Sequence, residues 1–476
     1  MAARHGISLT RRVLNAVYML GTAQAAGIFC SVVRTKLVAI WLDRAGVGLN
    51  AIFSNGSNLI STATQLNIRD SAVRDVSAAV TDGERELKNS VIRRWSLILG
   101  IVGALLMIAV SPLLSISSFG GSLAYTGHFA ALAPFVFFSA CSAGEFAIMQ
   151  GMGQLRSLAR ANIVAAVSGT LVAVPLFYFF RLDAIVAVID LYALAGYVSA
   201  YIWRERPRSS GVRLDRKTLW ANGRGFLTLG LSMSFSLLLT VLMQYILAAY
   251  INIVGGESAL GIYQSGYTLV NSYIGVIFSA IALEYYPRLV RFINAPRLCR
   301  TVVSHEMAVI VTIIAPVAVL FICASDFIVT LLYSSKFAAV LPMVSLAIIG
   351  AVFRGVSLCF AYRILAAGDS KAYIFTESMS VIVGLALNIT CYHYWSYTGL
   401  GVAYILWYAF YAALTAMVCR RRYGLKTPGV QLCNIAFAVA VTVLAIVLKN
   451  YVAWWFPALA ILPWLVPMSL RRLTRR

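Results

Sequence analysis

Charge is scarce in this sequence. Only 12% of the 476 residues are charged and 61% are hydrophobic, whereas about a quarter of the residues in ordinary soluble proteins are charged. A soluble chain of this length would fold into two or three domains with charged surfaces, so the composition excludes a soluble fold. Acidic residues are scarcer than basic ones, 17 against 39, and the net charge is +22. On a soluble protein such an excess would indicate a nucleic-acid partner.

Metal-binding and nucleotide-binding motifs are also missing. The eight cysteines stand singly without a CxxC pair, and the four histidines form no HExxH motif, which argues against a metal site. The sequence has no GxxxxGK[ST] phosphate loop. We therefore expect no metal, no cofactor and no catalytic residues, and a proton or sodium gradient is the candidate energy source.

The sequence is rich in long apolar runs, which recur to its end. About 20 apolar residues cross a bilayer as a helix, so the runs predict an all-α polytopic membrane protein with about fourteen transmembrane helices. Arg4, Arg11 and Arg12 before the first run are typical of a signal peptide, but the recurrence of similar runs favours an uncleaved first helix. The expected helices span approximately 13–42, 46–66, 91–116, 128–150, 158–180, 183–203, 225–252, 258–284, 303–333, 337–366, 371–394, 398–419, 430–449 and 451–470.

The distribution of basic residues supports this topology. With a cytoplasmic N-terminus, 32 of the 39 lysines and arginines fall in inner segments, and only Arg44, Arg181, Lys336 and Lys449 fall in outer ones. The positive-inside rule predicts this asymmetry, which places both termini in the cytoplasm and explains the excess charge without nucleic acid. The outer segments are short, and this argues against a membrane glycosyltransferase or polymerase, which would need external acid/base or metal-binding groups.

An internal repeat divides the chain. Gly153 and Gly368 lie 215 positions apart, as do Gly169 and Gly384, and a six-helix unit repeated in the same orientation predicts two lobes that rock against each other. The predicted domains are an N-terminal six-helix lobe, 1–203, a cytoplasmic basic linker, 204–224, a C-terminal six-helix lobe, 225–420, and an extra helix pair with a basic tail, 421–476.

Three expected helices carry polar side chains three and four residues apart, which places them on one helix face. Hydrogen bonds between helices are one explanation. A hydrated central cavity between the lobes is the other, and we favour it because two of these helices are related by the repeat. The candidate cavity-lining residues are Asn50, Asn58, Gln65, Ser236, Thr240, Gln244, Gln264 and Asn271.

Three basic residues lie inside expected helices. Arg34 and Lys36 lie about two helical turns below the outer surface, and Arg354 lies near the middle of its helix. One such charge costs roughly 2.5–3.5 kcal/mol at mid-membrane, so it needs a partner or a water-filled site. The structural explanations are snorkelling for Arg34 and Lys36 and pairing with a buried carboxylate for Arg354. The functional one is an anionic substrate, and guanidinium suits phosphate because its donors form a planar fork.

Three carboxylates, Glu145, Asp190 and Glu377, also lie inside expected helices. Intramembrane carboxylates can carry protons or sodium ions, which makes these residues candidates for ion coupling. They are explained equally well as static partners of Arg354 and Arg363, and the sequence leaves both explanations open.

Short motifs accompany these features: VRTKLVAI at 33–40, AGVGL at 45–49, LNIRDSAVR at 66–74, GIYQ at 261–264, YYPRL at 285–289 and AAGDSK at 366–371. Together they resemble the Wzx-type O-antigen and polysaccharide flippases, from residue 12 to about 420. These belong to the polysaccharide transporter family of the multidrug/oligosaccharidyl-lipid/polysaccharide superfamily. One departure is Asp43-Arg44, where relatives usually have Gly-Pro.

The resemblance implies two six-helix lobes around a central cavity in a bacterial inner membrane. It implies alternating-access transport of an O-antigen or other polysaccharide repeat unit, linked to undecaprenyl pyrophosphate, from the cytoplasmic to the periplasmic leaflet. In such flippases cavity arginines hold the pyrophosphate, which corresponds here to Arg34 with Lys36 beside it, and we add Arg354 from its depth. The implied partners are the bilayer, the lipid-linked glycan and the polysaccharide polymerase and glycosyltransferases of lipopolysaccharide assembly.

An alternative function in the same superfamily is the ion-coupled export of small drugs or metabolites. Cationic drugs would require buried carboxylates rather than buried bases, so the sign of the buried charge separates the two functions.

Overall fold

A computed structural model describes the chain except residues 1–25, 80, 205–214, 452–454 and 456–476. The described residues form helices joined by short turns, with no strand among them. Every expected span from the second to the thirteenth coincides with a helix, and the first is helical from residue 26. The fourteenth span, the first part of helix 13–42, much of the 204–224 linker and the basic tail lie outside the described residues. The predicted all-α fold is confirmed.

Eight stretches of the described chain are long and apolar enough to cross a membrane. Three of them, Leu155–Trp203, Ser234–Arg291 and Ser370–Tyr423, have 49, 58 and 54 residues, which is enough for two crossings each, since one crossing takes about 20. Each is interrupted near its middle by a residue with positive φ: Arg181 (48°), Gly256 (78°) and Ser396 (50°). The protein is therefore a multi-pass membrane protein.

The chain forms two compact units, Met1–Gly261 and Ile262–Arg476, called here the first and second units. The lobe boundary that the sequence predicts, at 204–224, lies one helix earlier and remains a prediction. The helices of the first unit are α2 (Asp43–Gln65), α3 (Ile68–Ser77), α4 (Asp82–Ser118), α5 (Thr126–Ala130), α6 (Ala133–Gly151), α7 (Leu155–Phe180), α8 (Ala184–Trp203) and most of α9 (Arg216–Tyr267).

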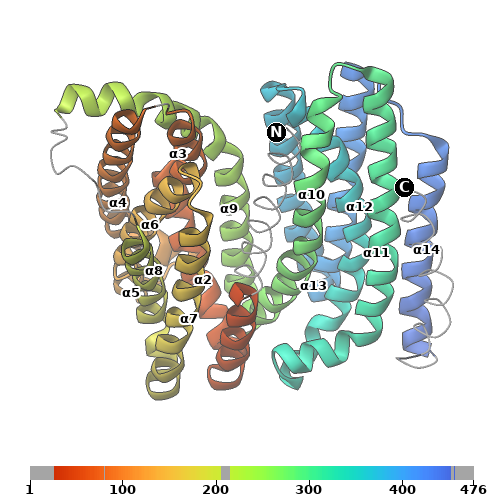
Figure 1. Ribbon diagram of the computed structural model, residues 1–476. Helices are drawn as coiled ribbons and strands as arrows, with labels where there is room; N and C mark the ends of the chain where they lie inside the picture. The colour runs from red at the N-terminus through yellow and green to blue at the C-terminus, as the bar shows by residue number, and fades with distance from the viewer. Residues whose placement is uncertain (1–25, 80, 205–214, 452–454, 456–476) are drawn as a thin grey trace. The chain divides into compact units, whose positions relative to one another are not determined.

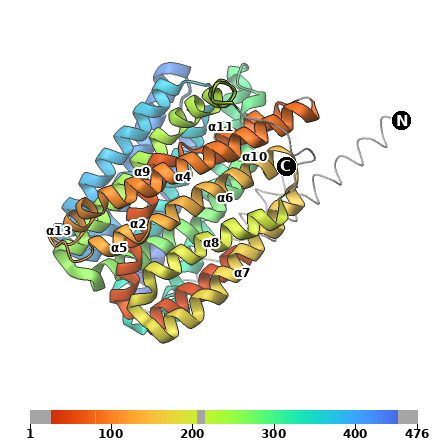
Figure 2. The same cartoon turned by 90° about the vertical axis from the view of Figure 1, so that its left-hand side faces the viewer.

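In the first unit α4 packs against α6, α6 against α8, and α8 against α7 (Figure 2). A capping box fixes the start of α4, because the Thr81 hydroxyl accepts the Glu84 N–H at 3.3 Å and the Glu84 carboxylate accepts the Thr81 N–H at 3.5 Å. Helix α2 is not among the eight apolar stretches, since its Asn, Ser and Gln side chains lower its mean hydropathy.

The second unit contains a π-helix (Thr268–Tyr273), α10 (Ile274–Arg291), α11 (Pro296–Leu332), α12 (Leu341–Ala366), α13 (Ser370–Tyr423) and α14 (Gly429–Tyr451). Side chains from these helices, among them Tyr285, Val319 and Phe360, form one hydrophobic core. Helix α14 packs on α11 (Figure 1), so the expected extra helix 430–449 is part of this unit.

The repeat is visible in how each unit packs one glycine. A Cβ atom on Gly169 of α7 would lie 2.4 Å from the Tyr192 ring of α8, and one on Gly384 would lie 2.5 Å from the Trp407 ring in the second half of α13. Tyr192 and Trp407 are again 215 positions apart. Both units therefore pack an aromatic side chain on the corresponding glycine of the preceding helical segment, as duplicated sequences would.

Candidate functional site

Arg354, on α12 of the second unit, is held by polar and aromatic side chains. Its Nη1 donates a hydrogen bond to Asn271 Oδ1 at 2.9 Å and another to the Tyr404 hydroxyl at 3.1 Å. The Tyr404 hydroxyl also donates to Asn271 Oδ1 at 3.3 Å. The ring centroids of Phe278 and Tyr408 lie 5.2 and 5.6 Å from the guanidinium carbon, within the range of cation–π attraction. Two hydrogen bonds and two rings thus fix the guanidinium group.

The partners of Arg354 are all neutral. In the described part of the chain, no carboxylate forms an ion pair with it; the ion pairs there involve other residues. The sequence offered pairing with a buried carboxylate as one explanation of this base, and the described residues supply no such partner. No described carboxylate therefore compensates its positive charge.

Asn271 belongs to the π-helix Thr268–Tyr273. Such segments interrupt α-helices mostly at functional sites, because the extra residue redirects side chains. The structure thus joins a candidate pyrophosphate residue, Arg354, to a candidate cavity residue, Asn271.

Glu377 lies in the first half of α13 and accepts a hydrogen bond from the Tyr411 hydroxyl. Tyr404, Tyr408 and Tyr411 are spaced so that they share one face of the second half of α13. Arg354 and Glu377 therefore contact the same helix face, at tyrosines about two turns apart. One row of tyrosines on α13 therefore binds both the basic residue Arg354 and the acidic residue Glu377.

Arg34 of the first unit also contacts an aromatic side chain. Its guanidinium carbon lies 4.6 Å from the ring centroid of Tyr192, the residue packed on Gly169. Among the described residues it forms no ion pair with a carboxylate. Lys36 is half-buried, and residues two apart do not share a helix face, so the structure directs Arg34 and Lys36 differently.

The stripe on α2 forms hydrogen bonds to a neighbouring helix through one of its members. The Gln65 amide donates to Ser61 Oγ at 2.5 Å and to Ser139 Oγ at 2.7 Å, which joins α2 to α6 as the interhelical explanation requires. Asn58 is exposed and Asn50 is half-buried. A cavity-lining role remains a prediction for all three residues. Asn50 and Asn58 are better candidates for it than Gln65, which binds α6.

On α9 the stripe residues Ser236, Thr240 and Gln244 are half-buried. Thr240 donates to the Ser236 carbonyl of its own helix at 3.0 Å. Gln264 is also half-buried. Their lining of a central cavity remains a prediction.

Two of the three candidate coupling acids have partners that explain their burial. Glu145 accepts two hydrogen bonds from Arg93, at 2.8 and 3.2 Å, and one from Arg204 at 3.3 Å. Asp190 accepts the backbone N–H of Phe135 at 3.0 Å, in the first turn of α6, where a carboxylate is stabilised by free N–H groups and the helix dipole. Ion coupling remains a prediction for both.

Sequence reasoning missed the aromatic partners of the two arginines. The spacing of Tyr404, Tyr408 and Tyr411 was a readable signal of a tyrosine face, and the 215-residue repeat already related Gly169 to Gly384. Nothing in the sequence, however, indicated which helix would meet that face.

Comparison with known families identifies the chain. A family model described as polysaccharide biosynthesis protein matches residues 79–342, which is more than half of the sequence. The chain belongs to the polysaccharide biosynthesis protein family. No match is found among curated proteins.

Solved structures with similar folds are transporters. A multidrug resistance MATE family transporter of the MOP superfamily, in an inward-facing conformation, matches at a TM-score of 0.69 with 14% identity, over 86% of this chain and 98% of its own. The lipid II flippase MurJ matches at 0.63 with 14% identity, over 97% and 98%. A MOP superfamily transporter from Pyrococcus furiosus matches at 0.61 with 14% identity, over 86% and 95%. The chain therefore has the polytopic fold of MOP superfamily transporters.

Proposed function

We propose that this protein is a flippase that moves an undecaprenyl-pyrophosphate-linked oligosaccharide, an O-antigen or other polysaccharide repeat unit, to the periplasmic leaflet of the inner membrane. The role is transport by alternating access, not catalysis. Membership of a polysaccharide biosynthesis family and a fold shared with a lipid II flippase support this proposal.

The observation that carries the proposal is that Arg354 has only uncharged side chains as described partners. A guanidinium inside a membrane helix, held by an amide, a phenol and aromatic rings, retains its full charge and several unused donors. Maintaining such a charge in a membrane costs free energy, and a pyrophosphate group offsets that cost by accepting charge-assisted hydrogen bonds. Arg34, which contacts its tyrosine, supplies a second base, and Lys36, on another face of the same helix, is the third candidate base.

The glycan occupies the predicted polar cavity, and the polyprenyl chain remains in lipid. Both termini are cytoplasmic, because this orientation puts 32 of 39 basic residues inside. A proton or sodium gradient drives the cycle, and Glu377 is the favoured coupling acid because its hydrogen-bond partner, Tyr411, belongs to the helix face that also holds Arg354. The polymerase and glycosyltransferases of the same pathway are the expected protein partners.

A deletion strain complemented with single variants tests the proposal. Arg354→Gln and Arg34→Gln should each abolish surface polysaccharide while membrane abundance of the protein stays unchanged. Normal polysaccharide in both variants would refute the assigned bases. Export of a small cationic compound that persists in both variants, with no effect on polysaccharide, would instead support the drug-exporter alternative.

A further inference from the structure

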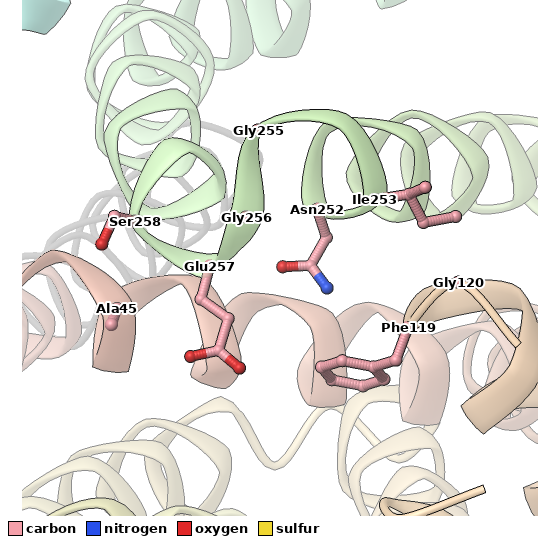
Figure 3. Close-up of a pocket in the computed structure, with 9 residues that line it drawn as sticks. All are labelled: Ala45, Phe119, Gly120, Asn252, Ile253, Gly255, Gly256, Glu257 and Ser258. Carbon is pink, nitrogen blue, oxygen red and sulfur yellow. The ribbon is translucent and has the colours of Figure 1, made fainter. Parts of the chain in front are cut away.

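A pocket in the first unit lies where α9 is interrupted. It has a volume of about 500 Å³ and is lined by Ala45, Phe119, Gly120, Asn252, Ile253, Gly255, Gly256, Glu257 and Ser258 (Figure 3). A volume of this order holds small organic ligands, which occupy pockets of about 300–1,000 Å³, and greatly exceeds that of a bare metal ion. The topology predicted from the basic residues puts this pocket at the outer end of the unit.

The chain turns sharply at the pocket because of one glycine. Gly256 has φ 78° and ψ 175°, a conformation essentially restricted to glycine. With Gly255 beside it, the turn presents backbone without side chains to the pocket. A ligand can therefore approach this wall closely.

Asn252 forms a second wall and carries an unsatisfied acceptor. Its amide nitrogen donates to the Ser118 carbonyl at 2.9 Å, which fixes the orientation of the amide. Its side-chain oxygen is buried and has no hydrogen-bond partner in the described chain. Figure 3 shows this oxygen turned toward Glu257, on the pocket side. A ligand hydroxyl that reaches this oxygen would satisfy it, which favours ligands that carry hydroxyl groups.

The same region is held rigidly against α4. Tyr245, two turns before Asn252 on α9, shares hydrogen bonds with the hydroxyls of Ser117 and Ser118 at 2.7 and 2.9 Å. Asn252 binds the Ser118 carbonyl. The walls of the pocket are therefore positioned before any ligand arrives, which lowers the entropy cost of binding.

Aromatic rings form the third wall. Phe119 lines the pocket, and the Tyr125 ring stacks on it with centroids 3.9 Å apart. Phe53 and His128 complete the cluster, with stacked rings 5.9 Å apart. Because Phe119 lines the pocket and is half-buried, its ring can contact the apolar C–H face of a sugar.

Glu257 supplies the only charge among the nine lining residues. Its carboxylate accepts a hydrogen bond from the Tyr125 hydroxyl at 3.2 Å. Burial and the nearby Glu257 charge raise the pKa of Tyr125, so the phenol keeps its proton and the carboxylate keeps oxygens free for a ligand. Without a lining base, the pocket suits donors and disfavours anionic groups.

We propose that this pocket is a carbohydrate subsite that takes one neutral or amino sugar residue, with Phe119 against its apolar face and Glu257 and Asn252 accepting from its hydroxyl groups. The inference rests on the proposed flippase function and adds the glycan class, because uronic acids and phosphorylated sugars are rejected by the carboxylate. The subsite holds the glycan at the predicted outer end while the pyrophosphate is bound elsewhere.

Saturation-transfer NMR on the purified full chain in lipid nanodiscs tests this subsite. The probes are methyl glycosides of glucose, galactose, N-acetylglucosamine and glucuronic acid. At least one neutral glycoside should bind, and methyl glucuronide should bind more weakly. Glu257→Gln and Phe119→Leu should each weaken neutral binding by about fivefold, and Glu257→Gln should also remove the discrimination against glucuronide. The matched control is Asp183→Asn, which changes an exposed acid at the same predicted end. It should change neither the affinity for neutral glycosides nor the discrimination against glucuronide.

Two outcomes overturn the subsite. One is the absence of binding by every glycoside. The other is binding that neither Glu257→Gln nor Phe119→Leu alters. A sodium titration that shifts the pocket resonances in the wild type but not in Glu257→Gln, without glycoside binding, would assign the pocket to a cation instead.

The subsite and the flippase function fail in different ways. Loss of surface polysaccharide in Arg354→Gln together with no glycoside binding refutes the subsite alone. Glycoside binding that depends on Glu257, combined with normal polysaccharide in both arginine variants, refutes the assigned pyrophosphate bases alone.

Discussion

The two units treat buried charge in opposite ways at two of their sites. In the first unit, Glu145 is surrounded by Arg93 and Arg204, so opposite charges meet. In the second, Arg354 has an amide and a phenol for partners and no described carboxylate. Both arrangements satisfy hydrogen bonds, but only the first brings opposite charges together.

The difference separates structural charges from functional ones. An ion pair shields both members from lipid, and removing one member leaves an uncompensated charge. A guanidinium without a carboxylate partner is not shielded in this way, and keeping it in the membrane costs free energy. Glu145 should therefore matter for stability, and Arg354 for transport.

The largest effect is expected from Arg354→Gln. The variant keeps a polar amide but loses the charge, and losing a charged contact to substrate costs about 2 kcal/mol or more, roughly 30-fold in binding. Transport of lipid-linked oligosaccharide in proteoliposomes should fall by at least about 30-fold. Arg300→Gln makes the same charge change at an exposed position and should transport normally. Equal transport by Arg354→Gln and Arg300→Gln would contradict a role of the Arg354 charge in transport.

Glu145→Gln should act on stability instead. It leaves Arg93 and Arg204 beside a neutral amide, and because these arginine side chains are 22% and 25% exposed, the cost should be about 2 kcal/mol, below the 3–5 kcal/mol of fully buried pairs. The measurement is thermal unfolding in detergent. Glu284→Gln breaks a pair whose acid is 57% exposed and should change stability by less than about 0.5 kcal/mol. Normal stability with lost transport in Glu145→Gln would reverse the assignment.

Tyr404→Phe tests the positioning of Arg354. The ring stays, but the hydroxyl that bridges Arg354 and Asn271 is removed, so transport should fall about threefold to tenfold, the value of one hydrogen bond to a charged group in a partly solvated site. Tyr394→Phe, on an exposed side chain of the same helix, is the control. A loss in Tyr404→Phe as large as in Arg354→Gln would mean that the tyrosine itself contacts substrate.

The smallest effect is expected at Asp369, between α12 and α13. The Ala372 N–H and the Arg422 side chain, which donate to its carboxylate, lower its pKa below the ordinary 3.8. A depressed folded-state pKa adds stability above the unfolded-state pKa, and this is lost as pH falls through the folded-state value. Asp369→Asn keeps the cap, so its unfolding temperature should be slightly below wild type at pH 7, and the difference should shrink as the pH falls below 3.8, the ordinary pKa of an aspartate. A constant difference would exclude the charge as its cause.

The sequence predicts the helices well because membrane spans are set by one strong constraint, about 20 apolar residues. It also identifies Arg354 and Asn271, since polar side chains in apolar runs stand out. It does not identify the partners of Glu145, because Arg93 belongs to α4 and Arg204 follows α8. Nor does it show that Asp190 binds the first turn of α6. Such pairings depend on helix packing, which hydropathy does not encode.

The most direct test of the central claim is the binding of a pyrophosphate group by Arg354. The measurement is the affinity of the full chain in nanodiscs for undecaprenyl pyrophosphate and for undecaprenol, with wild type, Arg354→Gln and Arg300→Gln. The account predicts tighter binding of the pyrophosphate by wild type and Arg300→Gln, and equal, weak binding of both lipids by Arg354→Gln. Undiminished preference for the pyrophosphate in Arg354→Gln would contradict it.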